Sequence, residues 1–416
     1  MPDQHPMMPF EQARERLLAA LKPLGKHQTV NLTEACAKTL ATDLRAPVSL
    51  PPAANSAMDG FALATDSSVG APADSRFKLR GEALAGQPWQ GKLAPGEAIR
   101  IMTGAVVPAG ANTVVMQENT HLDQDLLTLT HDCPPANNIR PTGDDIQAGE
   151  TVFKAGRRLQ VADLALLGAL GFSEVPVIRS LRVALLATGD ELRSAGETLQ
   201  PGDIYESNRL AVSLLVRHEP IELTDLGIVR DDPDSLRRVM QSAMTHHDVV
   251  VSTGGVSVGA ADYTRDILQE LGDIDFWKVA MKPGKPVAFG RLGGGWFFGL
   301  PGNPVSALVT AHQLLIPALQ SLAGQSVHPP LTLTAEAAEA FRKKPGRLDF
   351  QRAWLLQQQD SSGRWVHHVR PAPGQGSHML WSLSQANAYC VLPAEAGDVA
   401  PGDPVTVVPF DGALRV

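Results

Sequence analysis

Apolar residues recur every three or four positions in several stretches of this chain, a spacing that predicts amphipathic helices. The first stretch, residues 10–21, is followed by Pro and Gly and places on one stripe Phe10, Ala13, Leu17, Leu18 and Leu21. The same spacing predicts further helices in residues 32–41, 161–172, 208–218 and 234–244.

Short runs of alternating or continuous apolar residues predict strands, and their distribution divides the chain. Between residues 76 and 156, alternating pieces lie between turns rich in Pro, Gly and Asn, which indicates a small β-rich unit. From residue 181 to about 324, strands alternate with helical patterns, so we expect a mostly parallel sheet with helices on both faces. The last 90 or so residues lose this alternation, and their short strands predict a compact β-barrel or sandwich.

Three strands of the α/β segment run directly into glycine turns, in residues 181–192, 248–259 and 296–308. A strand that stops at small residues and hands over to a helix leaves backbone N–H groups pointing outward, which suits a phosphate or another oxyanion. One glycine turn on its own is more simply explained as a chain reversal. Three such turns with lysines between them favour a binding site.

The lysines lie in the segment KVAMKPGKP, residues 278–286, as Lys278, Lys282 and Lys285. If residues 278–282 are extended, Lys278 and Lys282 share one face and lie roughly 13 Å apart at about 3.3 Å per residue. That span fits an elongated ligand with several charges. Ordinary solvated lysines are the alternative.

The composition restricts the partners of the protein. Its 416 residues are too many for one ordinary core and suggest two to four domains. The hydrophobic fraction of 44% and the charged fraction of 19% are typical of soluble globular proteins. A net charge of −8 argues against a nucleic-acid partner, which requires a basic face. An anionic ligand would have to be held locally by lysines, backbone amides or a metal.

Cysteine usage and the chain start indicate a cytoplasmic protein. Cys36, Cys133 and Cys390 are far apart and without zinc-ligand spacing, so we expect reduced thiols. The first residues include acidic ones and no apolar core of a secretory signal. The stretch ADLALLGALGF is too short to span a bilayer, and no membrane association is expected.

Several motifs occur in a fixed order through nearly the whole chain. They comprise NSAMDGFA at 55–62, IMTGA at 101–105, GDDI at 143–146, TGDEL at 188–192, STGGVSVG at 252–259, ADYT at 261–264, KVAMKPGKP at 278–286, GLPGNPVS at 299–306 and GSH at 376–378. With these motifs the chain resembles the MoeA family of molybdopterin molybdenumtransferases and the homologous E domain of gephyrin.

The resemblance implies an α/β multidomain fold with four family domains. Residues 1–180 would hold domains I and II, with the β-rich domain II inserted at about 28–146. Residues 181–326 would form the molybdopterin-binding α/β domain III with its parallel sheet. Residues 327–416 would form the C-terminal β-barrel, domain IV. The resemblance also implies an elongated homodimer whose cleft combines domain II of one subunit with domains III and IV of the other.

The activity implied by the resemblance is insertion of molybdate into adenylylated molybdopterin, with release of AMP and of the finished molybdenum cofactor. Mg²⁺ would assist cleavage of the pyrophosphate. The adenylyltransferase that supplies the substrate and the chaperones of molybdoenzymes would be further partners. Two alternatives remain open: adenylylation of molybdopterin from ATP, and a dimeric scaffold without catalysis.

The family match implies two functional groups of side chains. The catalytic group comprises Asp59, Asp145, Asp231, Lys278 and Lys282. Mg²⁺ would be held by Glu191 and Asp262. Local alternatives exist, because Glu191 could be a first-turn acid favoured by a helix dipole and Asp262 could be an N-cap.

The remaining site residues are expected to bind substrate. They comprise Thr103, Thr188, Gly189, Asp190, Thr253, Gly254, Gly255, Ser257, Gly259, Lys285, Pro301, Gly302, Asn303, Pro304, Arg352 and Ser377. Arg352 and Ser377 would complete an oxyanion pocket for molybdate. The chain departs from the family pattern at Ala54, where Asp is usual, and at Ala260, where Glu is usual, which leaves the metal ligand set open.

Overall fold

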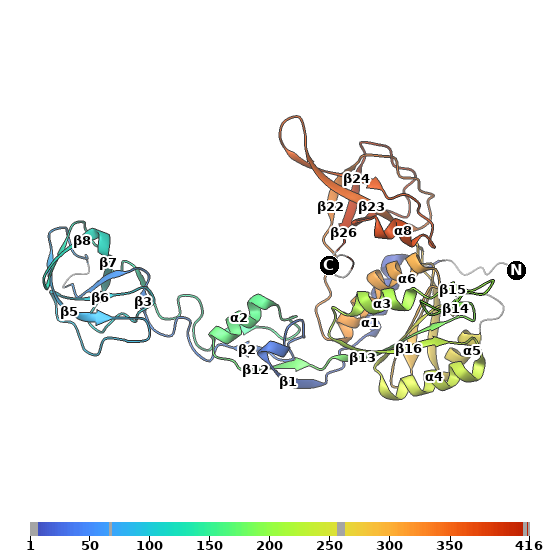
Figure 1. The fold of residues 1–416 in the computed structure, drawn as a ribbon, viewed down its shortest axis with the longest axis horizontal. Coiled ribbons are helices and arrows are strands. Elements are labelled where there is room, and N and C mark those ends of the chain that lie inside the picture. The colour runs from blue at the N-terminus through green and yellow to red at the C-terminus, as the bar shows by residue number, and fades with distance from the viewer. Residues whose placement is uncertain (1–6, 66–68, 256–262, 411–413, 415–416) are drawn as a thin grey trace.

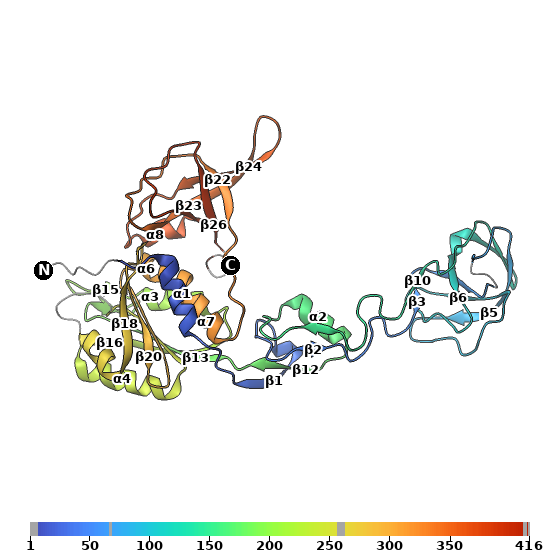
Figure 2. The same ribbon diagram turned by 180° about the vertical axis from the view of Figure 1, so that it is seen from behind.

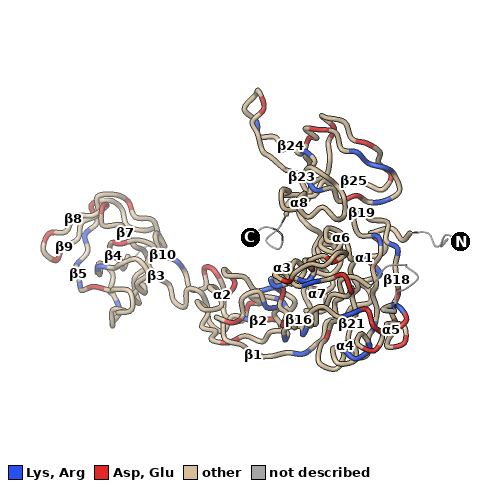
Figure 3. Tube along the Cα trace, turned by 45° about the vertical axis from the view of Figure 1, so that its right-hand side comes forward, with Lys and Arg blue, Asp and Glu red and all other residues tan. Residues whose placement is uncertain are grey.

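The molecule is elongated, with a β-rich unit at one end and two packed units at the other (Figures 1 and 2). The computed structural model describes residues 7–65, 69–255, 263–410 and 414. Between the two ends lies a small unit that contains α2 and the β1–β12 strand pair. Charges of both signs are interspersed over all of these units (Figure 3), so an anion must be held by local groups.

The α/β domain is built on a six-stranded sheet. Its order is β16 (Ile221–Val229), β13 (Leu181–Thr188), β17 (Val249–Thr253), β21 (Gly295–Leu300), β20 (Pro286–Leu292) and β18 (Gly272–Lys278). The first four strands pair in parallel and the last two join antiparallel. A mostly parallel sheet is therefore confirmed.

Side chains of β13 alternate between two cores, as the two-residue strand period requires. Leu181, Val183 and Leu185 pack with helices on one face, which are α1 (Phe10–Ala20), α3 (Asn208–Val216), α6 (Pro304–Thr310) and α7 (Ile316–Leu322). Ala184 and Leu186 pack with helices on the other face, which are α4 (Pro233–His246) and α5 (Tyr263–Leu271). Helices cover both faces, as expected.

The helical run Pro304–Leu322 is long and apolar enough to cross a membrane, but 83% of its most apolar window is buried inside the protein. It is the central helix of the core. A π-helical turn, Ala311–Leu315, separates α6 from α7. Pro317 accounts for this turn, because its ring displaces the carbonyl one turn earlier and it has no N–H to donate.

The C-terminal strands form a closed barrel. Its members are β22 (Leu333–Ala337), β23 (Leu348–Gln359), β24 (Trp365–Pro371), β25 (Ala388–Leu392) and β26 (Pro404–Pro409). The order β23-β24-β22-β26-β25 returns to β23, which leaves no open edge in this ring. Phe341, Cys390 and Val407 are among the fully buried side chains that fill it. The short strand β19 (Met281–Lys282) pairs with β23, and α8 (Leu380–Ser384) caps one side.

The β-rich unit holds a second six-stranded sheet. Its order is β7 (Thr113–Met116), β4 (Gly60–Leu63), β6 (Glu97–Ile101), β5 (Arg76–Ala83), β9 (Leu126–Leu129) and β8 (Thr120–Asp123). The middle unit contains β1 (His27–Asn31), β2 (Leu44–Arg45), β11 (Thr151–Phe153), α2 (Val161–Ala169) and β12 (Glu174–Ile178). The helix α1 precedes this unit in sequence but packs against α7 in the α/β domain.

Two predictions of local structure are wrong. Residues 32–41 form only a 3₁₀ turn, Leu32–Glu34, because Ala37 has a left-handed φ of 62° and Leu40 then bridges to Val177. Residues 278–282 are not one extended strand. The N–H of Val279 still donates to the carbonyl of Lys285, but the next carbonyl, that of Ala280, accepts from Leu348 of the barrel, so Lys278 and Lys282 belong to different sheets.

Helix α3 offers a matched pair of neighbouring leucines that tests the assigned core. Leu215 is 2% exposed in the main core, whereas Leu214 is 47% exposed. We expect Leu215→Ala to lower the free energy of unfolding by about 2–5 kcal/mol. Leu214→Ala should change it by less than about 0.5 kcal/mol. Urea unfolding followed by circular dichroism measures both, and equal losses would contradict the assigned orientation of α3.

Candidate functional site

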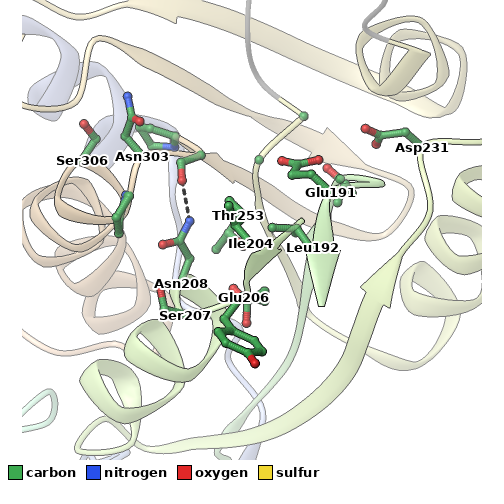
Figure 4. Close-up of a pocket in the computed structure, with 18 of the residues that line it drawn as sticks. Glu191, Leu192, Ile204, Glu206, Ser207, Asn208, Asp231, Thr253, Asn303 and Ser306 are labelled. Carbon is green, nitrogen blue, oxygen red and sulfur yellow. Dashed lines mark hydrogen bonds between the residues drawn. The ribbon is translucent and has the colours of Figure 1, made fainter. Parts of the chain in front are cut away.

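A cavity of about 530 Å³ lies at the carboxyl ends of the four parallel strands of the α/β domain. The chain leaves β13 toward α3 on one face of the sheet and leaves β17 toward α5 on the other. This divergence makes a topological switch point, the position where α/β sheets bind ligands. Figure 4 shows Glu191 and Asp231 together on one side of the cavity and Asn303 with Ser306 on the other.

The first loop of the cavity follows β13 and is shaped by Gly189. A Cβ at this position would lie 2.6 Å from a carboxylate oxygen of Glu191, so glycine lets that carboxylate fold over the loop. The chain then enters a short parallel pair, β14 (Leu192–Arg193) and β15 (Ile204–Tyr205), before α3 begins. The expected direct passage into a helix is therefore wrong here, and Glu191 is not a first-turn helix acid.

Three carboxylates gather beside this loop. The backbone N–H of Asp231 donates to a carboxylate oxygen of Asp190 at 3.3 Å, and Glu191 lines the cavity beside them. Partial burial raises the pKa of the Asp231 carboxyl, and the charges of Asp190 and Glu191 raise that pKa further. Such an accumulation of negative charge favours a bound cation. The next residue, Asp232, caps α4 by accepting from Ser235 N–H, as its sequence pattern indicates.

The second loop follows β17 and lies very close to the first. A Cβ on Gly254 would come within 2.7 Å of the carbonyl oxygen of Thr188, and one on Gly255 within 2.8 Å of the Thr188 hydroxyl. The hydroxyls of Thr188 and Thr253 are buried and have no hydrogen-bond partner among the described residues. They are available to a ligand oxygen. The predicted residues Ser257, Gly259 and Asp262 lie outside the described part of the chain.

The third loop joins β21 to α6 and has the predicted strand–turn–helix form. Pro304 occupies the first turn of α6, where its missing N–H costs nothing. The side-chain amide of Asn208, at the start of α3, donates to the carbonyl oxygen of Gly302 at 2.7 Å (Figure 4). This bond joins the third loop to α3. The predicted substrate-binding residues Pro301, Gly302, Asn303 and Pro304 all line the cavity.

The sequence did not reveal one wall of the cavity. Its residues, which are Leu192, Ile204, Tyr205, Glu206, Ser207, Asn208, Pro286 and Ser306, come mostly from the β14–β15 pair and the start of α3. The hydroxyl of Tyr205 donates to the carbonyl of Glu197 at 2.8 Å, which leaves the ring 48% exposed. The polar run ahead of the helical stripe at 208–218 was the available signal, because it marks a helix start.

None of the three predicted lysines lines the cavity, although their segment leads into Pro286, which does. Lys278 lies opposite the cavity residue Pro286 in the β18–β20 pair. Lys282 donates to Asp349 of the barrel at 3.1 Å, and Lys285 is exposed. The lysine segment therefore lies between the α/β sheet and the barrel.

Arg352 and Ser377 belong to the barrel and have different roles in the structure. Arg352 is 1% exposed, and its guanidinium donates to the Ser382 hydroxyl and to the carbonyls of Gly374 and Gly376. Burial lowers the pKa of Arg352. The carbonyl of Ser377 accepts from the N–H of Val305 in α6 at 3.0 Å, so the loop that Arg352 holds is joined to the third loop of the cavity.

Asp59 directly precedes β4 and Thr103 follows β6, so both lie in the β-rich unit at the far end of the molecule (Figure 1), whereas Asp145 lies beside the bridge between Leu50 and Ile146 in the segments that lead to that unit. Both the backbone N–H and the hydroxyl of Thr103 donate to one Asp59 oxygen at 2.7 Å. These hydrogen bonds lower the pKa of the Asp59 carboxyl. Asp145 is exposed in a turn. A single chain does not bring these residues to the cavity.

The described residues contain no group of three or more His, Cys, Asp or Glu side chains arranged to hold a metal ion. Of the two predicted Mg²⁺ ligands, Glu191 lies in the described part of the chain and lines the cavity, whereas Asp262 lies outside it. Asp190 and Asp231 supply further carboxylate oxygens nearby, which is the donor chemistry that Mg²⁺ prefers.

Comparison with known proteins covers almost the whole chain. Residues 8–171 match the MoeA N-terminal region (domain I and II), residues 184–321 a probable molybdopterin binding domain, and residues 334–410 the MoeA C-terminal region (domain IV). A Haemophilus influenzae protein named molybdopterin molybdenumtransferase is 39% identical over 98% of this chain and 100% of its own length. The chain belongs to the MoeA family.

Other MoeA relatives agree over the same length. A Mycobacterium tuberculosis protein named molybdopterin molybdenumtransferase 2 is 35% identical over 95% of this chain and 98% of its own. A crystal structure of the Pyrococcus horikoshii MoeA protein superposes with a TM-score of 0.83 at 26% identity, over 97% of this chain and 100% of its own. The multidomain fold with its α/β domain and C-terminal barrel is thereby confirmed.

The cavity lies within the region that matches the molybdopterin binding domain. That match runs from residue 184 to 321 and so includes the three loops, from Thr188 to Pro304. The family match and the geometry therefore agree on the domain that holds the cavity.

The raised pKa of Asp231 predicts a pH-dependent effect on stability. At a pH above the raised pKa, the charged carboxylate of Asp231 destabilises the folded state. At a pH below 3.8, the ordinary pKa of an aspartate, the carboxyl is protonated in both the folded and the unfolded states and has no such effect. We expect Asp231→Asn to raise the free energy of unfolding at pH 7, by about 0.5 kcal/mol or less because the residue is exposed to solvent. The gain should fade as the pH approaches 4. Denaturation at several pH values measures it.

Asp234→Asn is the matched control for this measurement. Asp234 is 87% exposed and pairs with Arg237 in the next turn of the same segment. Its removal should bring no gain at pH 7. A loss of stability in Asp231→Asn at pH 7 would contradict the assigned charge crowding.

Proposed function

We propose that this chain is a molybdopterin molybdenumtransferase. It inserts molybdate into adenylylated molybdopterin and releases AMP and the molybdenum cofactor. The observation that carries the proposal is the cavity at the switch point, within a chain that matches the named relatives from end to end. The domain boundaries expected from the sequence, 1–180, 181–326 and 327–416, belong to the same proposal.

The loops of the cavity bind the pterin phosphate and the nucleotide. The hydroxyls of Thr188 and Thr253, which have no partner among the residues that the structure describes, supply donors, and the glycines beside them allow close approach of phosphate oxygens. Cleavage of the phosphoanhydride places negative charge on the phosphoryl oxygens of both fragments. The ammonium groups of Lys278 and Lys282 neutralise that charge.

Mg²⁺ is the proposed resident metal, held by Glu191 with Asp262 and assisted by the carboxylate of Asp231. When bound, it supplies a Lewis acid that polarises phosphoryl oxygens. The raised pKa of Asp231 supports this assignment, since a cation would offset the repulsion among the carboxylates. Molybdate is a substrate, and Ser377 with the loop held by Arg352 borders its entry.

The active form is a cytoplasmic homodimer whose two sites each combine both subunits. Asp59, Thr103 and Asp145 lie far from the cavity of their own chain, so a second subunit must present them. An adenylyltransferase supplies the substrate, and carrier chaperones of molybdoenzymes take the product.

The direct test combines the purified protein with adenylylated molybdopterin, Mg²⁺ and molybdate, and measures AMP. Molybdate-stimulated AMP release is the expected result. Consumption of ATP with release of pyrophosphate would instead indicate the adenylyltransferase. Absence of both reactions, with binding of peptide partners, would indicate a scaffold.

Glu191→Gln tests the metal assignment. Removal of one anionic ligand should raise the Mg²⁺ concentration for half-maximal AMP release by about tenfold or more. Glu197→Gln is the control, because Glu197 is exposed in the same connection and its side chain faces solvent. Calorimetric titration of the substrate-free protein with Mn²⁺ gives an independent reading. Unchanged metal dependence in Glu191→Gln would remove this residue from the metal site.

Mixing two inactive variants tests the shared site. We expect Asp59→Ala and Glu191→Gln each to be inactive as homodimers at low Mg²⁺. After denaturation and refolding together, each mixed dimer contains one site with both changes and one intact site. Equal mixing should restore about a quarter of wild-type activity, because half of the dimers are mixed. No recovery, with mixed dimers demonstrated by mass spectrometry, would place both residues on the same chain's site.

A further inference from the structure

One carboxylate outside the predicted site contacts a predicted site lysine. Lys282 and Asp349 lie directly opposite each other in the parallel pairing of β19 with β23. The ammonium of Lys282 donates to Asp349 Oδ2 at 3.1 Å. The strand register itself therefore makes this pair, as in other cross-strand contacts of opposite charge.

The two partners differ in burial. The Asp349 side chain is 4% exposed, whereas the Lys282 side chain is 38% exposed. The same Asp349 oxygen also accepts from the side-chain amide of Gln351 at 3.1 Å, and that amide donates to the carbonyl of Arg342 at 2.8 Å. The carboxylate is thus fixed by the barrel, and the lysine reaches from it toward solvent.

Backbone contacts fix the lysine segment on both sides. The N–H of Leu348 donates to the carbonyl of Ala280 at 2.9 Å, which attaches the segment to the barrel. On the other side, a Cβ at Gly284 would lie 2.5 Å from the hydroxyl of Thr310, so the segment is pressed against α6. Two residues further on, Pro286 forms part of the cavity wall.

Asp349 is a buried negative charge within a largely cationic neighbourhood. Lys343 is 5% exposed and its ammonium donates to the carbonyls of Ala394 and Ala396. Burial lowers the pKa of Lys343, and the charge of Asp349 opposes that shift. Burial also lowers the pKa of Arg352, and the charge of Asp349 acts in the opposite direction there too. Without the carboxylate, Lys282 would face these buried cations uncompensated.

We infer that Asp349 is a positioning residue, which holds the Lys282 ammonium from within the barrel, four residues before the cavity residue Pro286. The inference rests on the proposed function for the use of Lys282 in binding an oxyanion. It makes the barrel a functional part of the site, because the correct placement of Lys282 requires the β19–β23 pairing.

The test uses the full-length protein with Asp349→Asn, which keeps the side-chain shape and removes the charge. Limited acetylation with acetic anhydride, read by peptide mass spectrometry, reports the reactivity of Lys282 relative to the exposed Lys22. Loss of an ion pair that holds the ammonium should raise the Lys282 labelling rate by about fivefold. Asp360→Asn, which breaks the exposed pair with Arg364 on the same barrel, should leave it unchanged.

Kinetics separate positioning from a general loss of structure. In Asp349→Asn, the KM for molybdate should rise by about tenfold while kcat changes less, as expected when ground-state binding is weakened. If Asp349→Asn does not fold, Gln351→Leu replaces it in the test. This change removes the hydrogen bond from Gln351 that holds the Asp349 carboxylate, so the Lys282 labelling rate and the KM for molybdate should rise by less than in Asp349→Asn.

The outcomes distinguish the two proposals. Unchanged Lys282 labelling in a folded Asp349→Asn or Gln351→Leu protein, or an equal change in Asp360→Asn, would overturn the positioning role. If the wild-type protein releases no AMP but Asp349→Asn still increases the labelling of Lys282, the positioning role of Asp349 is supported and the proposed reaction is rejected.

Discussion

The parallel pairing of β13 with β16 on one side and with β17 on the other is the constraint on which the site depends. Because the chain leaves β13 toward α3 on one face of the sheet and leaves β17 toward α5 on the other, the two connections diverge at the carboxyl ends of the strands and leave a cavity between them. Gly254 and Gly255 then let the second loop lie against Thr188. Apolar burial on both faces supplies the free energy that keeps this crowded edge in place.

Periodicity in the sequence predicted most of the helices and strands because it reports burial directly. The stripe at 208–218 became α3, and the short strands expected in the last 90 or so residues include β23 and β24. The helix expected at 32–41 does not form, because Leu40 pairs instead with Val177, 137 positions later in the chain. The local pattern of apolar residues carries no information about that distant partner. Long-range pairing overrode a weak local preference.

The site could be predicted where small residues end a strand, and not where apolar residues form a wall. Thr188, Gly254 and Asn303 were found because glycine and proline turns interrupt regular patterns. Leu192 and Ile204 were missed because apolar side chains in short strands are usually core residues. The separation of Lys278 from Lys282 depends on β19 pairing with a barrel strand more than 60 residues later, which local spacing does not encode.

Two antiparallel segments form the only covalent route, within the described chain, to the β-rich unit. They run side by side as a neck, with Leu50 bridged to Ile146 and the N–H of Ala46 donating to the carbonyl of Glu150. One hydrolysed peptide bond in either segment leaves the unit attached through the other. Nicking of the neck by a protease would therefore produce two fragments that still migrate together until they are denatured.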